Sequence, residues 1–332
     1  MDTVRIGTLG AAKITPFALT KPATKVPEAE VVAVAARDRA RAEKFAAKRG
    51  IPRVHDSYDA LLADPEIDAV YNPLPNGLHC EWTIKALEAG KHVLCEKPFT
   101  ANAAEAEQVA AVADRTGLVL MEAFHYRYHP LAARMKEIVA SGELGDVRHV
   151  ETFMCIPLPK PGDIRYRLDL AGGATMDVGS YAIHMNRLLA GAEPEVTSAQ
   201  AKLSSPDVDR WMTASFRYPN GATGQMTCSM FSRQLLKIQL KVTGSEGELR
   251  VFNPTAPYLY HRITVKKPGG TTKERIPGRD STYLFQLRAF TKAVLEGAPT
   301  LTPPSESVAN MRVIDAVYRA AGLPVRGAPR GA

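Results

Sequence analysis

The sequence predicts an α/β protein with two domains: a doubly wound parallel sheet first, and then an α+β domain with a large, mostly antiparallel open sheet. Three observations support this prediction. The chain has 332 residues, 45% of them hydrophobic, which is enough to bury two cores. Its first 125 residues alternate short β-branched runs with alanine-rich segments of helical period, as βαβ units do. Beyond residue 146 the pattern changes to longer alternating strands separated by turn residues.

The first domain is expected to span residues 1–125. Its predicted strands are Val4–Leu9, Val31–Ala36, Ala69–Asn72, His92–Cys95 and Leu118–Glu122. Its predicted helices are Arg39–Lys48, Ser57–Ala63, His79–Ala89 and Asn102–Thr116. The last helix has the clearest end signals, because Asn102 and Glu105 have the spacing of a capping box and Gly117 is a typical C-terminal cap.

The second domain is expected to span residues 126–323, with a mobile tail at residues 324–332. Its predicted strands are Val147–Ile156, Val196–Leu203, Met212–Tyr218, Ala222–Met230, Leu236–Thr243 and Glu248–Phe252. Its predicted helices are Leu131–Ser141, Thr282–Glu296 and Ser305–Ala321. Packing of the last two helices back on the first domain is left open. Because no helix is assigned to cover the sheet, we expect its partly apolar face to form a homodimer or a higher even oligomer.

Composition excludes several function classes. Residues 1–124 carry 15 Lys+Arg against 17 Asp+Glu, and the remainder carries 27 against 18, without a run of five like charges or a basic stripe interleaved with aromatics. We therefore predict no nucleic-acid partner. The apolar runs are too short to cross a membrane, and the N-terminus has no signal-peptide pattern, so a cytoplasmic protein is expected.

Metal and disulfide chemistry are not indicated either. The four cysteines (Cys80, Cys95, Cys155 and Cys228) are far apart and form no C-x-x-C pair, which favours reduced thiols. His125 and His129 are four residues apart, but no third ligand follows nearby, so no metal site is predicted.

A degraded dinucleotide fingerprint follows the first predicted strand. The G-x-G-x-x-G spacing is filled by Gly10, Ala12 and Thr15. Gly10 permits the tight turn, and Ala12 keeps the backbone small where a pyrophosphate would approach, whereas Thr15 only makes the helix and the strand pack less closely. On this segment alone, dinucleotide binding and a plain βα turn are equally good interpretations.

The end of the second strand favours a phosphorylated cofactor. An NAD-specific site usually has Asp or Glu here, whereas this chain has Arg37, with Arg41 one turn further on. A guanidinium pairs bidentately with a 2′-phosphate, so NADP(H) is preferred and NAD(H) remains the alternative. An exposed arginine at the start of a helix is the other interpretation of Arg37.

Longer motifs resemble those of the Gfo/Idh/MocA oxidoreductases. They are Tyr71–His79, Glu96–Pro98, Glu122–Pro130, Gly162–Tyr166 and Gly172–Tyr181. They keep the family's order and spacing over nearly the whole chain. The chain is most similar to the branch that contains glucose-fructose oxidoreductase, dihydrodiol dehydrogenase and nucleotide-sugar 3-ketoreductases. The resemblance implies a Rossmann domain, an open-sheet domain at its carboxyl edge, and hydride transfer on a sugar-like substrate.

The resemblance also implies roles for individual residues. Lys97 matches the family lysine beside the nicotinamide ribose and the reacting oxygen, with a Lys97–Pro98 bond that is cis in relatives. Asp177 and Tyr181 match the substrate-facing pair four residues apart, with tyrosine where many members have histidine. A phenol donates a proton at neutral pH, and a nearby ammonium lowers its pKa toward the working range. We therefore expect Lys97 and Tyr181 to be catalytic, although alone they would be interpreted as a surface lysine and a core tyrosine.

Asp177 and Arg165 lie within these motifs, and His184 lies three residues beyond Tyr181, on the same face if the segment is helical. All three are expected to bind substrate; contact with the nicotinamide is the alternative for Arg165, and a purely structural role for His184 is equally open. The expected cofactor-binding residues are Gly10, Ala12, Lys13, Ile14, Arg37, Arg41, Asn72, Pro73, Leu74, Asn76, His79, Glu96 and Lys97.

The sequence thus predicts an NADP(H)-dependent oxidoreductase that acts on a small molecule. Hydride would move between the nicotinamide and a carbinol or ketone carbon of a sugar, a sugar derivative or a cyclic polyol. One alternative is a trans-dihydrodiol-type dehydrogenase that acts on a non-carbohydrate ring. Another is a catalytically silent NADP(H)-binding sensor or partner protein.

Overall fold

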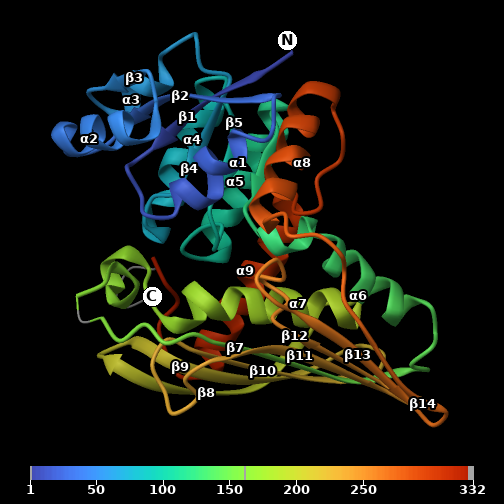
Figure 1. The fold of residues 1–332 in the computed structure, drawn as a ribbon. Helices are drawn as coiled ribbons and strands as arrows, with labels where there is room; N and C mark the ends of the chain where they lie inside the picture. Colours follow the sequence, from blue (N-terminus) through green and yellow to red (C-terminus); the bar gives the residue numbers. More distant parts are fainter. Residues whose placement is uncertain (1, 161, 328–332) are drawn as a thin grey trace. The chain divides into compact units, whose positions relative to one another are not determined.

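The computed structural model describes residues 2–160 and 162–327, which form two compact units (Figure 1). The first unit contains the described residues up to Tyr128 together with Asp280–Val308. The second unit contains His129–Arg279 and the described residues from Ala309 onward. Neither unit is therefore one continuous stretch of chain.

The first unit is built on a six-stranded parallel sheet with the strand order β3-β2-β1-β4-β5-β6. Its strands are β1 (Val4–Leu9), β2 (Ala29–Ala35), β3 (Arg53–His55), β4 (Ala69–Asn72), β5 (His92–Cys95) and β6 (Leu120–Glu122). Strands β2 and β3 are added on one side of β1, and β4, β5 and β6 on the other. This reversal of the strand order between β1 and β4 confirms the doubly wound fold. In such sheets, ligands bind outside the carboxyl ends of the strands at this reversal.

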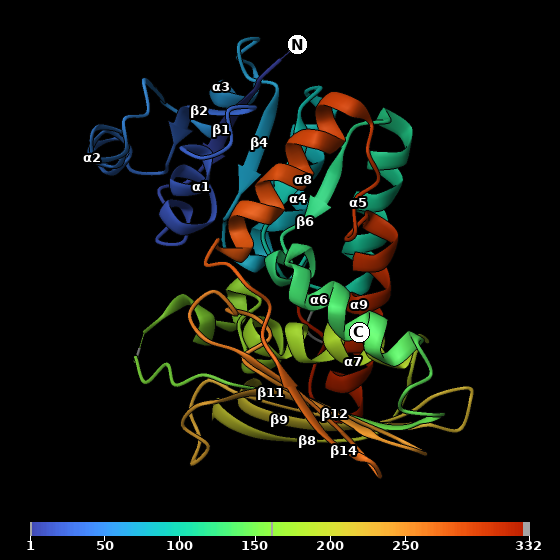
Figure 2. The ribbon, with the colours of Figure 1, turned by 45° about the vertical axis from the view of Figure 1, so that its right-hand side comes forward.

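Helices cover both faces of this sheet. They are η1 (Pro16–Thr20), α1 (Lys21–Ala23), α2 (Arg39–Arg49), α3 (Tyr58–Leu62), η2 (Asn76–Leu78), α4 (His79–Glu88), α5 (Ala103–Thr116), η3 (His125–Tyr128) and α8 (Thr282–Glu296). Helix α8 lies beside the sheet (Figure 2). Its Leu284, Leu287 and Phe290 are buried in one cluster with Ile6 and Tyr71. A distant segment of the chain thus completes the core of the first unit.

The end signals of α5 are those expected from the sequence. The Asn102 side chain accepts from the Glu105 backbone at 2.9 Å, and Glu105 accepts from the Ala101 backbone at 3.0 Å. Gly117 ends the helix in the left-handed conformation. These bonds satisfy backbone donors that the first turn of a helix leaves open.

The second unit is built on an eight-stranded sheet with the order β14-β13-β12-β11-β7-β10-β9-β8. Its strands are β7 (Val147–Cys155), β8 (Glu195–Ser205), β9 (Val208–Arg217), β10 (Thr223–Ser229), β11 (Lys237–Gly244), β12 (Glu248–Phe252), β13 (Arg262–Lys267) and β14 (Gly270–Glu274). Among the described strands, β7 and β10 pair in parallel and the other neighbours are antiparallel. This confirms the prediction of a mostly antiparallel sheet.

One face of this sheet is covered by helix α7 (Ser180–Ala190), which lies along it in Figure 1. The Thr152 hydroxyl donates to the Ala182 carbonyl at 2.9 Å, and the Asn186 amide donates to the Val150 carbonyl at 3.2 Å. The expectation that no helix covers the sheet was therefore wrong. Most of the side chains of α7 are buried, polar ones included, so the sequence lacks the polar stripe that marks a surface helix.

Two further helices and three single-turn segments complete the described part of the second unit. They are α6 (Pro130–Ala140), η4 (Ile164–Tyr166), η5 (Leu168–Leu170), η6 (Thr175–Gly179) and α9 (Pro304–Ala320), whose first five residues belong to the first unit. The mobile tail predicted for residues 324–332 is wrong for its first part, because Arg326 is buried in an ion pair with Asp209. Residues 328–332 lie outside the described part of the chain.

Candidate functional site

The loop after β1 forms a narrow backbone cradle. Gly10 has a φ of +95°, and a Cβ there would lie 3.3 Å from Leu74 Cδ2 and 3.7 Å from the Tyr58 hydroxyl oxygen. The Arg41 guanidinium donates to the Ala11 carbonyl at 2.8 Å, which fixes the loop to α2. The position needs glycine because other residues rarely adopt this φ and because the space is already limited.

Thr15 lies at the end of this loop and has a buried hydroxyl group that is available to a ligand. Its Oγ1 is fully buried and has no hydrogen-bond partner within residues 2–160 and 162–327. A buried hydroxyl without a partner costs free energy that a ligand can recover. Together with the cradle at Gly10, it fits a loop that receives a polar group of a bound dinucleotide. The sequence interpretation of Thr15 as a packing residue did not anticipate this.

Three side chains gather beyond the ends of β2 and β3. Arg37 and Arg41 are exposed, and both lie near the phenol of Tyr58. Burial raises the pKa of Tyr58, whereas the Arg37 charge, a hydrogen bond from the Arg37 backbone and the Arg41 charge lower it. Two cations and a phenol can hold a phosphate. Tyr58 was missed by sequence reasoning, although its place just after the helix cap Ser57 was a usable signal.

The loops after β4 and β5 are joined by His79. Its Nδ1 lies 2.8 Å from the Pro98 carbonyl oxygen and its Nε2 lies 2.7 Å from the Leu74 carbonyl oxygen. Burial lowers the pKa of His79 to about 4, so the ring is neutral at pH 7 and donates to one of these oxygens. The predicted cofactor residue His79 therefore uses both ring nitrogens within the protein and shapes the loops.

Asn72 and Glu96 play similar internal roles. The buried Asn72 amide donates to the Thr83 hydroxyl at 3.1 Å. Glu96 is buried and accepts from the Tyr71 hydroxyl at 2.7 Å. Both side chains thus hold the carboxyl edge of the sheet in shape. Pro73 and Asn76 are half-buried in the same loop, whereas Lys13 is exposed and Ile14 half-buried in the loop after β1.

Lys97 stands at the carboxyl end of β5, half-buried among buried neighbours. The Lys97–Pro98 bond is cis, as the resemblance implied. Burial is the main cause that lowers the pKa of His125, to about 3, and the Lys97 charge lowers the pKa of His125 and of His79 further. With both rings neutral, the Lys97 ammonium is the cation at this point of the sheet edge.

The expected substrate residues of the second unit come together on one helical run. The π-helix η6 (Thr175–Gly179) carries Asp177 and leads directly into α7, which carries Tyr181 and His184. Spacings of four and three residues place side chains about one turn apart. Tyr181 is 6% exposed and His184 is 1% exposed. Segments of π-helix are rare and are often found at functional sites.

Arg165 joins this group through Asp177. Arg165 Nε lies 3.2 Å from Asp177 Oδ1, and its Nη1 donates to Asp163 at 3.1 Å. The Asp177 charge is the main cause that raises the pKa of Arg165. The two predicted substrate residues are thus held as a charged pair on the run that carries Tyr181.

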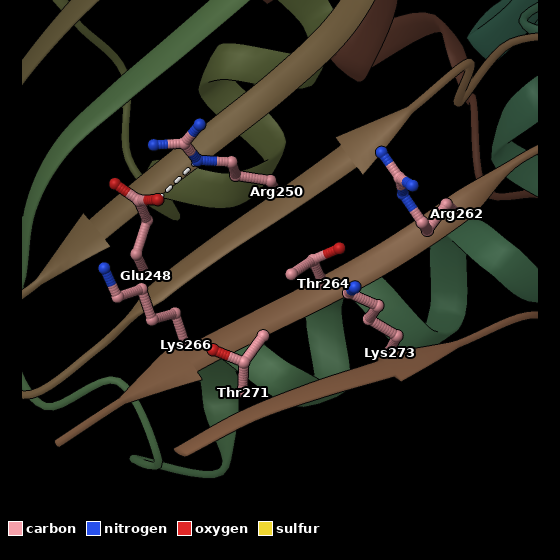
Figure 3. Close-up of a pocket in the computed structure, with 7 residues that line it drawn as sticks. All are labelled: Glu248, Arg250, Arg262, Thr264, Lys266, Thr271 and Lys273. Atoms are coloured by element: carbon pink, nitrogen blue, oxygen red, sulfur yellow. Dashed lines mark hydrogen bonds and ion pairs between the residues drawn. The ribbon is translucent and has the colours of Figure 1, made fainter. Parts of the chain in front are cut away.

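A shallow basic groove of about 360 Å³ lies elsewhere on the second unit (Figure 3). It is lined by Glu248, Arg250, Arg262, Thr264, Lys266, Thr271 and Lys273. In the strand register, Arg250 of β12 lies opposite Lys241 of β11, and Lys241 lies opposite Glu151 of β7. Glu151 directly precedes Thr152 in the same strand. Consecutive side chains of a strand point to opposite faces of the sheet, and Thr152 points to α7. Glu151, Lys241 and Arg250 therefore lie on the face away from α7, and so does the groove. We do not assign it to the candidate site.

The described residues contain neither a metal-binding cluster nor a membrane-spanning helix. No group of three or more His, Cys, Asp or Glu side chains in the described residues could hold a metal ion. Among the described helices, none combines the length and apolar character needed to cross a membrane.

Family models match most of both units. One, described as an oxidoreductase family with an NAD-binding Rossmann fold, matches residues 4–124. The other, described as a GFO/IDH/MocA C-terminal domain, matches residues 132–250. The two matches are in the order expected from the motifs.

Individual proteins and structures agree with these models. D-xylose 1-dehydrogenase (NADP(+)) 2 of Haloferax volcanii is 40% identical over 301 residues, which are 90% of this chain and 92% of the relative. Trans-1,2-dihydrobenzene-1,2-diol dehydrogenase of Mus musculus is 36% identical over 234 residues, covering 69% and 68% of the two chains. A 3-ketoreductase from Actinomadura kijaniata, solved with NADP and TDP-benzene, has a TM-score of 0.89 at 32% identity and covers 96% of this chain and 98% of its own. The chain therefore belongs to the Gfo/Idh/MocA family of oxidoreductases.

Proposed function

We propose that the protein is an NADP(H)-dependent oxidoreductase that transfers hydride between the nicotinamide and a carbinol or ketone carbon of a sugar or sugar derivative. The observation that carries this proposal is the helical run on which Asp177, paired with Arg165, precedes Tyr181 by four residues. A charged pair offers donors and acceptors to sugar hydroxyls, and a phenol supplies a proton. The names of two relatives support the same reaction class, because one is a dehydrogenase of D-xylose and the other is a 3-ketoreductase.

The cofactor, when bound, would accept the hydride in carbinol oxidation or supply it in ketone reduction, and this chain's residues bind the cofactor and manage the proton. We assign the loop Gly10–Thr15 to the pyrophosphate, and Arg37, Arg41 and Tyr58 to the 2′-phosphate. Lys97 is assigned to the nicotinamide ribose, and Tyr181 donates a proton to the ketone oxygen or accepts one from the carbinol. Asp177 and Arg165 orient the substrate hydroxyls.

The test compares three substrate classes with NADP⁺ or NADPH as required. A free aldose, a nucleotide-linked 3-ketosugar and a cyclic trans-diol are each offered, and the nicotinamide absorbance reports turnover. Turnover of either sugar supports the proposal and selects between a dehydrogenase and a ketoreductase. Turnover of the cyclic diol alone supports a second candidate function, a dihydrodiol-type dehydrogenase, which the mouse relative favours. The relatives and the structure offer nothing for a silent sensor, and we do not carry that hypothesis forward.

Tyr181→Phe tests the proton donor directly. The variant keeps the ring packing and loses only the hydroxyl, so we expect turnover to fall by roughly 10²–10⁴-fold while NADPH affinity hardly changes. Combined with Lys97→Ala, the loss should be smaller than the product of the two single losses if both groups serve one step. Turnover close to that of the wild type in Tyr181→Phe would remove Tyr181 from the mechanism and make His184 the next candidate.

A further inference from the structure

A buried ionic cluster lies beside the helical run in the second unit. Arg326 and Asp209 both have side chains with 0% exposure, and Arg326 Nη2 lies 3.0 Å from Asp209 Oδ1. The guanidinium carbon lies 4.0 Å from the centre of the Tyr318 ring, and the Tyr318 hydroxyl donates to the same Asp209 oxygen at 3.0 Å. One carboxylate oxygen is thus held by two side chains from the C-terminal part of the chain.

The other oxygen of Asp209 holds the start of the helical run. Oδ2 accepts from the Thr175 backbone N–H and from the Thr175 hydroxyl, both at 2.7 Å. A carboxylate has about four lone-pair sites, so these bonds fill it. Thr175 precedes Asp177 by two residues and Tyr181 by six. Asp209 therefore links Arg326 to the segment that carries both.

Arg326 also contacts this segment directly. Its Nε donates to the Gly172 carbonyl at 2.8 Å. The next residue, Gly173, has a φ of +138°, and a Cβ there would lie 2.1 Å from Asp209 Oδ1 and 3.1 Å from Arg326 Nη2. The Gly173 N–H donates to the Arg165 carbonyl at 2.8 Å, and its carbonyl accepts from the Asp177 N–H at 3.0 Å. The bonds made by Arg326 thus lead to Arg165 and Asp177.

We propose that Arg326 is a positioning residue, which fixes the segment Gly172–Thr175 and through it Asp177, Arg165 and Tyr181. The proposal rests on the function proposed above for these three residues. Stability alone does not account for the cluster, because apolar residues of similar volume often replace a buried ion pair at no cost. Directional bonds to one carbonyl and one carboxylate instead fix where the backbone lies, and proton transfer depends on such placement.

Two matched pairs of variants test the proposal. Arg326→Lys keeps the charge but cannot bond Gly172 and Asp209 with a planar fork. Arg187→Lys is its control, since Arg187 is also a buried arginine of this unit and pairs with Glu193 at the other end of α7. Thr175→Val removes the hydroxyl bond to Asp209 together with the hydroxyl's contact to the buried Cys228 thiol, and Thr175→Ser keeps the hydroxyl.

The catalytic readout is kcat per folded molecule, measured well below each variant's Tm, together with KM and NADPH affinity. We expect kcat to fall ~10–100-fold in Arg326→Lys and ~3–10-fold in Thr175→Val, with NADPH affinity within about twofold of the wild type. Thr175→Ser and Arg187→Lys should keep kcat within about twofold, even if Arg187→Lys lowers Tm. A purely structural cluster predicts lower Tm in Arg326→Lys with kcat unchanged, and that result would overturn the proposal.

Hydrogen exchange provides a readout that does not depend on the substrate. Amides of the peptide 172–181 should exchange faster in Arg326→Lys than in Arg187→Lys, measured by mass spectrometry on the full chain. If the wild type turns over no sugar but this peptide loosens, the proposed function fails and the positioning of the segment stands. If the peptide keeps its wild-type exchange, Arg326 does not position it, whatever the activity.

Discussion

Arg37, an exposed side chain just beyond β2, is expected to determine cofactor choice in the function proposed here. Arg37→Asp should weaken NADPH binding by roughly 10–100-fold, which corresponds to about 1.5–3 kcal/mol for a lost charge-assisted contact, and should spare NADH. Titration of nicotinamide fluorescence with both cofactors measures the preference. Arg39→Asp is the matched control, because Arg39 is also exposed but pairs with Glu43 on α2. Equal affinities for NADPH and NADH in the wild type would contradict this prediction.

Lys97 should behave differently from Tyr181 when it is replaced. Lys97→Ala removes the ammonium at the end of β5, so we expect turnover and cofactor affinity to fall together, turnover by ~10²-fold or more. Lys85→Ala is the control, because Lys85 pairs with Glu81 on the exposed side of α4. Steady-state kinetics and NADPH titration on the two variants check the difference. Loss of turnover with full cofactor affinity would place Lys97 at the proton step alone.

Single residues also show how far the sequence leads toward the site. Gly10 and Arg37 could be selected from the chemistry of phosphate binding, whereas Lys97 and Tyr181 gained their roles only from the motifs around them. Asp209 and Arg326 could not be found, because no local pattern marks two charges that are 117 residues apart and fully buried. A charged residue is almost never fully buried unless it is paired, so its burial cannot be predicted until its partner in the fold is known.

At the level of elements, His79 makes the loops after β4 and β5 sensitive to pH. Its folded pKa of about 4 lies below the ordinary value of ~6.5, so between these values the unfolded chain binds a proton that the folded chain does not. The stability due to neutral His79 is complete above pH ~6.5 and is lost as the pH falls toward 4. We expect a loss of ~2 kcal/mol between pH 7 and pH 5 from this residue.

Urea denaturation at the two pH values measures this loss in the wild type and in His79→Gln. The variant should lose ~2 kcal/mol less than the wild type over the same interval, since glutamine does not titrate. The same dependence in both proteins would assign the pH effect to other groups, of which the buried His125 is the first to examine.

The cap of α5 sets a second expectation for stability. Asn102→Ala removes the side-chain acceptor for the Glu105 N–H and should cost about 0.5–2 kcal/mol of unfolding free energy. Gln108→Ala, on the exposed side of the same helix, should change it by less than about 0.5 kcal/mol. Thermal and urea unfolding of both variants check this, and equal stability of the two would show that the cap contributes nothing.

Elements with a clear period were predictable, and those without one were not. Strand β12 and helix α8 have the bounds expected from the sequence. Strands β13 and β14 were missed, because β13 has apolar side chains only at Ile263 and Val265 and β14 has none. Helix α7 was not predicted as an element, and a helix here was only the condition under which Tyr181 and His184 share a face. Its buried polar residues interrupt the alternation of apolar and polar faces that marks a helix in a sequence.

At the scale of the whole molecule, the sheet of the second unit has a second face, opposite α7, which no helix of the described residues covers (Figure 1). By strand register, Phe153, Trp211 and Phe252 lie on that face, among polar side chains. We predict a homodimer or higher even oligomer through it. Light scattering should give at least twice 36.1 kDa at micromolar concentrations.

A substitution on this face provides the control for the oligomer. Trp211→Glu should shift the protein toward the monomer, because a carboxylate would be buried in the interface. Leu259→Glu, at a side chain that is 74% exposed between β12 and β13, should leave the mass unchanged. A mass of 36.1 kDa for the wild type would refute the prediction.

The return of α8 to the first unit limits how the protein can be divided. A fragment that stops at residue 128 would leave the surface around Ile6 and Tyr71 open to water, because Leu284, Leu287 and Phe290 come from a segment more than 150 residues later. Proteolysis between the units would therefore not release an intact nucleotide-binding module from the N-terminal half. A chain that joins residues 2–128 to residues 280–308 through a short linker is the piece expected to fold alone, because Thr302 also bonds Glu122 and Tyr128. During synthesis, the first strands made must wait for one of the last helices before their core is closed.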